Sequence, residues 1–360
     1  MKPKGPKISV IVPTYNRADM LGGCIEAILC QTTHDFELII VSDGSIDETE
    51  KVVKNYHDPR ILFFEKENGG QASARNLGII KSNGKYISLC DDDDRFCQDH
   101  LMILSNFLDT HEDVGLAYSD ALWIYKDGSR KPEVRFSQDF DKKSLENYNY
   151  ITTQTVLFRK SCLKNTDPFN EDPRFRNGLE DWEFFLRLSD NYAFSHIKKV
   201  SSEYTVHEGN SFHPNSGYDY NRAFFLVRTQ RFQYLITKFD HSLFDHVDHM
   251  YPYHLVQCFL NNGKFQEALE TANKLYRLYN IYNKINNKPR LTELVIFFSL
   301  GISSFATGHE AHATVFFNNI LDSPFYKLID KQFVEFVSQH VNRVANIGLK
   351  TLLRNCFLRI

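Results

Sequence analysis

Four consecutive carboxylates, Asp91–Asp94, are the strongest chemical signal in this sequence. They follow the apolar run Tyr86–Cys90, which has the composition of a buried strand. Two like charges about 4 Å apart repel by about 1 kcal/mol in water and about 4 kcal/mol near a protein surface, so the cluster favours a bound cation. Carboxylate oxygens without paired thiols favour Mg²⁺ or Mn²⁺. The alternative is a solvated acidic loop, which is the usual fate of a charge run.

Polar residues also follow two other apolar runs. Pro13-Thr-Tyr-Asn-Arg17 ends the run that starts at Ile8, and Asp43-Gly-Ser45 follows the run Phe36–Ser42. In open sheets with parallel strands, ligands bind beyond the carboxyl ends of the strands. The residues after these runs and Asp91–Asp94 are therefore expected to share one binding edge.

Two common nucleotide-binding loops are excluded. The turn after the first apolar run has no glycine, whereas the dinucleotide-binding loop of dehydrogenases needs several. The stretch Gly78–Tyr86 is not a phosphate loop, because it has Tyr86 where Ser or Thr is required and runs from a helix into a strand.

The elements that must position these residues alternate between strands and helices, which predicts an α/β fold with helices on both faces of a mostly parallel sheet. Strands are expected at Ile8–Pro13, Phe36–Ser42, Ile61–Phe64, Tyr86–Cys90 and Thr153–Phe158, a hairpin turn at Lys126–Ser129, and helices at Arg17–Cys30, Asp47–Tyr56, Gln71–Lys81 and Leu179–Ser189. After about Asn221 only helical periodicity remains, so the second domain is expected to be all-α.

Composition and charge divide the chain in the same way. The 360 residues are 42% hydrophobic and 24% charged, as in ordinary globular proteins, and the net charge of −3 argues against a nucleic-acid binder. Residues 1–214 carry a net charge of −8 and residues 215–360 a net charge of +5. The turn-rich stretch Glu208–Gly217 favours a boundary near residue 214, with domains 1–214 and 215–360.

Cysteine usage and hydropathy indicate the compartment. The seven cysteines form no CxxC pair, and no apolar stretch reaches the roughly 20 residues that span a bilayer. The N-terminus lacks the apolar core of a signal peptide. We expect a cytoplasmic protein, at most peripheral on the inner face of the membrane.

Five motifs occur in order within the first 214 residues: Ile8–Arg17, Asp43-Gly-Ser45, Asn68–Gly78, Gly84–Asp94 and Glu180-Asp-Trp182. With these motifs the segment resembles the family-2 inverting glycosyltransferases, which have the GT-A fold. The resemblance implies transfer of a sugar from a nucleotide-sugar, with a UDP or dTDP carrier, to a hydroxyl of a glycan, lipid-linked or protein acceptor, in surface polysaccharide or glycoconjugate synthesis.

The resemblance also implies residue roles. Pro13 and Tyr15 would form a wall against the base, Asp43 would accept from a base N–H, and Arg75 would meet phosphate oxygens. The residues expected to bind the nucleotide-sugar are Pro13, Tyr15, Arg17, Asp43, Arg75, Asp91 and Asp92. The alternatives are a rim aromatic for Tyr15 and a surface salt bridge for Arg75.

The remaining expected roles concern the metal and the base. Asp93 would hold Mn²⁺ or Mg²⁺ together with His207, with His213 in reserve, and the register of the Asp91-x-Asp93 triplet is uncertain by one residue. Asp181 would be the base that takes the acceptor proton. Glu180 would shape the acceptor site and Trp182 would pack the helix into the sheet.

Two other functions compete with this one. A non-catalytic scaffold that binds sugar-nucleotides or glycans would use the helical half to recruit partners. A nucleotidyltransferase, which also uses paired aspartates on an α/β sheet, would release pyrophosphate.

The helical half shows a weak repeat. Gly263 and Ala268 match Gly308 and Ala313 in spacing, but the repeat is 45 residues long rather than 34, so we predict two helical hairpins that are tetratricopeptide-like at best. Residues 341–360 are basic and amphipathic if helical. They would either cap the helical domain or lie on an anionic membrane, which leaves a peripheral membrane contact or a protein partner as roles for this half.

Overall fold

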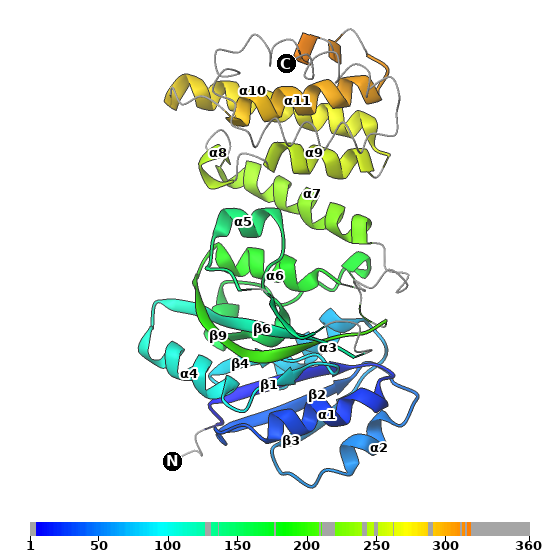
Figure 1. The fold of residues 1–360 in the computed structure, drawn as a ribbon, viewed down its shortest axis with the longest axis vertical. Coiled ribbons are helices and arrows are strands. Elements are labelled where there is room, and N and C mark those ends of the chain that lie inside the picture. The colour runs from blue at the N-terminus through cyan, green and yellow to red at the C-terminus, as the bar shows by residue number, and fades with distance from the viewer. Residues whose placement is uncertain are drawn as a thin grey trace. The chain divides into compact units, whose positions relative to one another are not determined.

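The computed structural model describes residues 5–126, 131–135, 137–175, 178–208, 210, 220–239, 243–247, 251–261, 263–286, 291–309, 312–313 and 315–317. The chain divides into two compact units, residues 1–223 and 224–360. The first unit is α/β, and the described part of the second is helical (Figure 1). The domain boundary at residue 214 stays a prediction, and so does the ligand role of His213, which lies outside the described residues.

The first half of the sheet is parallel, as the sequence predicts. Its strands are β1 (Ile8–Thr14), β2 (Phe36–Ser42), β3 (Ile61–Glu65) and β4 (Tyr86–Leu89), in the order β3-β2-β1-β4. The connecting helices are α1 (Ala18–Leu29), α2 (Thr49–Lys54) and α3 (Gln71–Lys81). These bounds agree with the expected elements to within a few residues, and the α/β class is confirmed.

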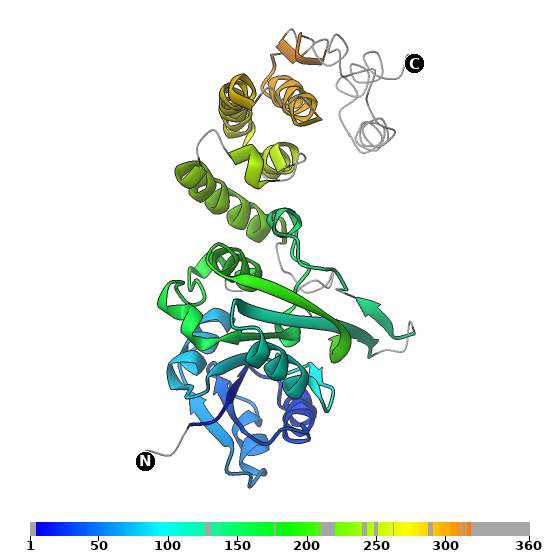
Figure 2. The same ribbon diagram turned by 90° about the vertical axis from the view of Figure 1, so that its left-hand side faces the viewer.

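The second half of the sheet is mixed. Its elements are β5 (Arg95–Phe96), α4 (His100–Thr110), β6 (Val114–Tyr125), β7 (Glu133–Arg135), α5 (Lys142–Asn147), β8 (Val156–Arg159), α6 (Glu180–Ser189) and β9 (Ala193–Val206). β8 lies antiparallel between β4 and β6, whereas the long strands β6 and β9 run parallel, side by side (Figure 2). The expected mostly parallel sheet therefore describes only the half that contains β1–β4.

Helices cover both faces of the parallel half. Val10 and Val12 of β1 pack on one face, in a cluster with apolar residues of α1 and α4. Ile39 and Val41 of β2 pack with Ala74 of α3 on the other face. Because side chains alternate along a strand, the apolar runs fill both cores at once.

The stretch predicted as a strand from Thr153 begins differently. Thr153–Thr155 form a turn of 3₁₀-helix, and the strand β8 starts only at Val156. The hydroxyl of Thr155 donates to the carbonyl of Thr152 at 2.7 Å, and such a local bond competes with strand pairing. The expected hairpin turn at Lys126–Ser129 falls largely outside the described residues, although β6 and β7 on either side of it pair antiparallel.

The second unit contains five described helices: α7 (Tyr220–Phe239, which starts just before the unit boundary), α8 (Leu243–His246), α9 (Tyr251–Asn261), α10 (Phe265–Asn286) and α11 (Leu291–Ala306). Gly263 follows α9 and Gly308 follows α11, and both adopt the left-handed conformation, with φ of +69° and +81°. Ala268 and Ala313, five residues later, are fully buried. The two Gly-x4-Ala elements thus turn the chain in the same way, while kinship with tetratricopeptide repeats stays a prediction.

Across the described residues, none of the helices is long and apolar enough to cross a membrane. The amphipathic segment 341–360 lies outside the described residues.

Candidate active site

The loops after β1 and β2 are tied together at the carboxyl edge of the sheet. The side-chain oxygen of Asn16 accepts from the backbone of Ile46 at 2.8 Å, and the backbone of Asn16 donates to the Ser45 hydroxyl at 3.0 Å. Asn16 has a φ of +51°, a conformation that asparagine tolerates better than most residues. Tyr15, the residue before Asn16, is 49% exposed, whereas Pro13 is buried in β1.

Asp43 organises the turn before α3. Its carboxylate accepts from Lys66 Nζ at 2.8 Å and from the backbone N–H groups of Gly69 and Gly70 at 2.9 and 2.7 Å. Gly70 has a φ of +93°, which favours glycine at this position. The structure therefore gives Asp43 a role in shaping the loop, and its expected contact with a base stays a prediction.

One group of charges, here called the Arg17 cluster, consists of Arg17, Asp92, Asp93 and His207. Arg17 Nη1 pairs with Asp93 and lies 3.3 Å from Asp92 Oδ1. His207 Nε2 lies 2.9 Å from Asp93 Oδ2. The Arg17 side chain is 30% exposed, whereas the side chains of Asp92 and Asp93 are 7% and 8% exposed, so solvent reaches this cluster mainly at the guanidinium.

The carboxyl groups of the Arg17 cluster differ in protonation. Burial, together with the charge of Asp93, raises the pKa of Asp92 to about 7. Burial acts on Asp93 in the same direction, but the hydrogen bond with His207 and the charge of Arg17 hold its pKa below the usual value. Asp93 therefore carries the full negative charge that a cation would meet.

A second group, here called the Arg75 cluster, consists of Arg75, Asp91, Glu180 and Asp181. Arg75 Nη2 lies 2.6 Å from Asp91 Oδ1, and Nη1 lies 2.5 Å from Glu180 Oε1. The side chain of Arg75 is 2% exposed. The cluster joins the end of β4 to the start of α6, and the charge of Asp181 also acts on the guanidinium.

This geometry corrects the expectation for Arg75. A surface salt bridge is wrong, because the side chain is buried. Its two Nη atoms pair with Asp91 and Glu180, and its expected contact with phosphate oxygens stays a prediction. Burial raises the pKa of Glu180 to about 7 against the opposing charge of Arg75. Among the described residues, Glu180 Oε2 is buried without a hydrogen-bond partner, which fits a carboxyl that holds a proton.

Asp181 lies in the first turn of α6 and is partly exposed. Its oxygens accept from Asn149 Nδ2 at 3.0 Å and from the backbone of Trp182 at 2.7 Å. Burial raises the pKa of the Asp181 carboxyl, although the positive charge of Arg75 opposes the shift. Leu179, directly before α6, has a φ of +64°, a strained conformation of the kind found near functional sites.

Trp182 and Asp94 have structural roles. The indole Nε1 of Trp182 donates to the carbonyl of Leu145 at 2.7 Å, so this buried side chain joins α6 to α5, and its expected packing into the sheet stays a prediction. Asp94 accepts from the backbone of Thr205 at 2.9 Å, and burial raises its pKa well above the usual value. Asp94 therefore joins the segment after β4 to β9.

The sequence did not point to three residues that support the site. Gln71 Nε2 and the Thr153 hydroxyl donate to Asp91 at 3.0 and 3.1 Å, and Asn149 donates to Asp181. Only Gln71 carries a signal in the sequence, because it opens a helix at the binding edge of the sheet.

Comparisons with known proteins identify the family of the N-terminal segment. Residues 9–165 match the family model described as Glycosyl transferase family 2. This segment is a family 2 glycosyltransferase domain. It contains the strand ends of the parallel half and Asp91–Asp94, while Asp181 and His207 lie beyond the matched residues.

The relatives of this family 2 domain extend beyond the part that aligns with this chain. Hyaluronan synthase of Pasteurella multocida is 28% identical over 283 residues, which are 78% of this chain and 28% of that protein. An uncharacterized glycosyltransferase of Rickettsia typhi is 34% identical over 211 residues, 56% of this chain and 65% of that protein. The chain therefore spans less than two thirds of the length of either relative.

The fold has counterparts among solved structures. Residues 1–349 of TarS from S. aureus, crystallised with UDP-GlcNAc, superpose with a TM-score of 0.57 at 20% identity, covering 86% of this chain and 90% of that chain. At this identity the likeness concerns the fold alone, and it shows that the fold of the α/β unit is GT-A-like.

The donor set of the Arg17 cluster fits a divalent cation. Asp93 and His207 offer one carboxylate and one imidazole from the same side, and the Arg17 guanidinium already sets a positive charge between two carboxylates. Within the described part of the chain, no group of three or more His, Cys, Asp or Glu side chains is arranged to hold a metal. A metal here would take its other ligands from substrate phosphates and water, as Mg²⁺ does in many phosphate sites.

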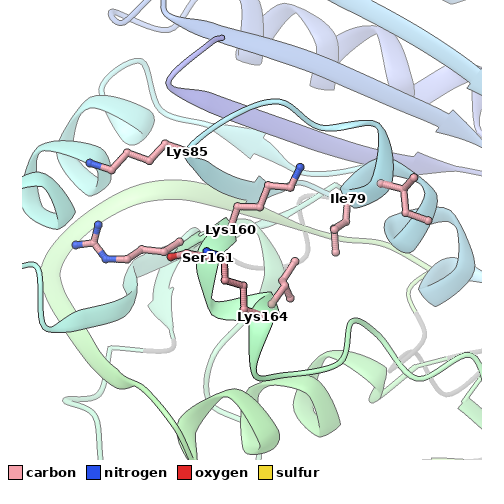
Figure 3. A pocket seen from close by; sticks show the side chains of 8 residues that line it. Ile79, Lys85, Lys160, Ser161 and Lys164 are labelled. Carbon is pink, nitrogen blue, oxygen red and sulfur yellow. The ribbon is translucent and has the colours of Figure 1, made fainter. Parts of the chain in front are cut away.

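A hollow of about 600 Å³ lies apart from this site (Figure 3). Lys85, Lys160 and Ile79 are among the residues that line it, and Lys85 precedes β4 whereas Asp91 follows it. Lys85 pairs with Asp109 at 2.9 Å, and Lys160 donates to the carbonyl of Ser82 at 2.6 Å. The hollow is therefore at the opposite end of β4 and is not part of the candidate active site.

Proposed function

We propose that this chain transfers a sugar from a nucleotide-sugar to a hydroxyl of an acceptor, with inversion at the anomeric carbon. The observation that carries the proposal is the juxtaposition of two charge clusters: Asp91–Asp94, in the segment that matches family 2, contributes to both, and the second also contains Asp181. The first suits a diphosphate with its cation, and the second suits a base.

The proposed donor is a uridine or thymidine nucleotide-sugar. TarS, which shares the fold, was crystallised with UDP-GlcNAc. Tyr15 is exposed at the strand ends, where an aromatic ring can lie against a base. Arg17 is close enough to Asp93 to pair with phosphate oxygens if the cation takes its place on the carboxylates.

Asp93 and His207 are the residues proposed to hold Mn²⁺ or Mg²⁺. A divalent cation at this position neutralises the charge of the leaving diphosphate. The same cation would compete with Arg17 for Asp93, since both positive groups need the same carboxylate.

Asp181 is proposed to act as the general base. The acceptor oxygen forms a bond to the anomeric carbon as the bond from that carbon to the phosphate oxygen breaks, and its electron pair leaves with the nucleoside diphosphate. Asp181 takes the acceptor proton on the face opposite the leaving group. Its raised pKa improves it as a proton acceptor, and Asn149 fixes the carboxylate.

The proposed acceptor is a glycan, in the synthesis of a polysaccharide or glycoconjugate. Hyaluronan synthase and chondroitin synthase of Pasteurella multocida, at 28% and 27% identity, support this class. A protein or lipid-linked acceptor would use the same base. The helical unit is proposed to engage a partner protein or the membrane surface.

A panel of nucleotide-sugars tests the proposal by thermal stabilisation, with and without Mn²⁺. A ligand at 100 times its dissociation constant adds about 2.7 kcal/mol to the unfolding free energy. The nucleotide-sugar that stabilises the protein is then incubated with the protein and glycan acceptors. Release of nucleoside diphosphate supports the transferase, whereas release of pyrophosphate indicates a nucleotidyltransferase and binding without release indicates a scaffold.

A further inference from the structure

Tyr204 of β9 is held in place by a stack of side chains. It lies opposite Trp123 of β6, and the two rings stack with centroids 5.0 Å apart and an interplanar angle of 29°. The guanidinium of Arg135, from β7, lies 5.0 Å from the Trp123 ring centroid. The side chains of three neighbouring strands thus fix the orientation of the Tyr204 ring.

The position of Tyr204 in β9 brings it to the candidate active site. The next residue, Thr205, donates its backbone N–H to Asp94, and His207 reaches Asp93 three residues later. Burial and the charges of four carboxylates raise the pKa of the Tyr204 phenol; in decreasing order of effect these are Asp94, Asp93, Asp91 and Asp181. The phenol is therefore neutral and lies within electrostatic reach of both charge clusters.

The hydroxyl of Tyr204 differs from those of nearby tyrosines. Tyr118 donates to the carbonyl of Gln138 at 2.7 Å, and Tyr125 donates to Glu133 at 2.7 Å. In the part of the chain that the structure describes, the Tyr204 hydroxyl makes no hydrogen bond, and the residue is partly exposed. A well-held donor near the catalytic carboxylates without a protein partner is suited to a substrate.

We propose that the Tyr204 hydroxyl donates a hydrogen bond to the transferred sugar of the donor, and so helps to select that sugar. The inference rests on the proposed function. The neighbours of Tyr204 along the chain bind Asp94 and Asp93, which belong to the part of the site proposed to hold the diphosphate and the sugar attached to it. A neutral hydroxyl is suited to a hydrogen bond with a sugar oxygen, whereas the charge of the diphosphate is proposed to be met by Arg17 and the cation.

Calorimetric titration of Tyr204→Phe with UDP and with the UDP-sugar that stabilises the wild type, both with Mn²⁺ and without acceptor, tests the inference. The substitution keeps the ring stack and removes one neutral hydrogen bond. We expect the affinity for the UDP-sugar to fall about 3- to 10-fold while the affinity for UDP stays the same. Tyr125→Phe is the matched control. Tyr125 lies in β6, two residues after Trp123, and its hydroxyl donates to Glu133, so its removal should change neither affinity.

Each outcome separates this inference from the proposed function. Unchanged affinity of Tyr204→Phe for the UDP-sugar, or equal losses for UDP and UDP-sugar, would overturn the contact with the sugar alone. A wild type that binds no nucleotide-sugar would overturn the proposed function and this inference with it. A thermal midpoint of Tyr204→Phe equal to that of the wild type would show that the stack of side chains remains folded.

Discussion

The Arg17 and Arg75 clusters each set one guanidinium between two carboxylates, but they differ in exposure and in what they join. The Arg17 side chain is 30% exposed and pairs with adjacent residues of one loop, Asp92 and Asp93. The Arg75 side chain is 2% exposed and joins Asp91 to Glu180, 89 residues further along the chain.

This difference indicates a division of labour within the site. A guanidinium that solvent reaches, as that of Arg17, is held less firmly than a buried one and can exchange a carboxylate partner for a ligand. A buried pair leaves a desolvated charge behind when one partner is removed, so it stays together. The Arg17 cluster is therefore suited to receive the diphosphate and its cation, and the Arg75 cluster to hold Asp181, the proposed base, in a fixed place.

The largest expected effect comes from Asp181→Asn. The amide keeps the shape of the side chain but cannot take a proton, so transfer should fall by ~10²–10⁴. Donor binding should survive, because the diphosphate is proposed to bind at the Arg17 cluster. Turnover assays measure the effect on transfer, and titration of the nucleotide-sugar measures the effect on binding. Near-normal turnover would show that another residue is the base, with Glu180 the first candidate.

Arg75→Met compares the clusters through stability. It leaves Asp91 and Glu180 without their buried partner and should lower the unfolding free energy by about 3 to 5 kcal/mol. Arg17→Met is the matched control and should cost less than Arg75→Met, since the Arg17 side chain is 30% exposed. Denaturant titration followed by tryptophan fluorescence measures both, because Trp123 and Trp182, the two tryptophans, are in the α/β unit. Equal losses would contradict the division of labour.

A smaller effect is expected on the pH dependence of stability. Burial raises the pKa of Glu180 to about 7 from its usual 4.5, so the folded state binds more protons than the unfolded state between these pH values. The contribution of Glu180 to stability is therefore full below about pH 4.5 and is lost as pH rises through about 7. Glu180→Gln does not titrate, and it should reduce this decline by about 1 to 3 kcal/mol. A decline as steep in Glu180→Gln as in the wild type would show that other groups cause it.

The parallel half of the sheet could be predicted from the sequence because local pattern determines it. Helix α3 has the predicted bounds, Gln71–Lys81, since glycine precedes it and its apolar residues repeat with helical spacing. The strands β1 and β2 are apolar throughout and bounded by turn residues, so their ends, where ligands bind, were also predictable.

The partners within the site could not be predicted, because they are set by contacts between distant segments. Nothing in the residues around Arg75 indicates that Glu180 lies against it, and the resemblance suggested a phosphate instead. Asn149 and Thr153 are ordinary polar residues in the sequence, and only the packing of α6 and the turn before β8 brings them to the carboxylates. The mixed order of β4, β8, β6 and β9 likewise depends on long-range pairing.

Calorimetric titration of UDP into the wild type and Asp93→Ala, with and without Mn²⁺, tests the central claim most directly. The claim is that the Arg17 cluster receives the diphosphate of a nucleotide-sugar through a cation on Asp93. We expect Mn²⁺ to strengthen UDP binding to the wild type, and we expect Asp93→Ala to abolish that gain because the diphosphate then faces the remaining carboxylates. Unchanged Mn²⁺-dependent affinity in Asp93→Ala would contradict the account.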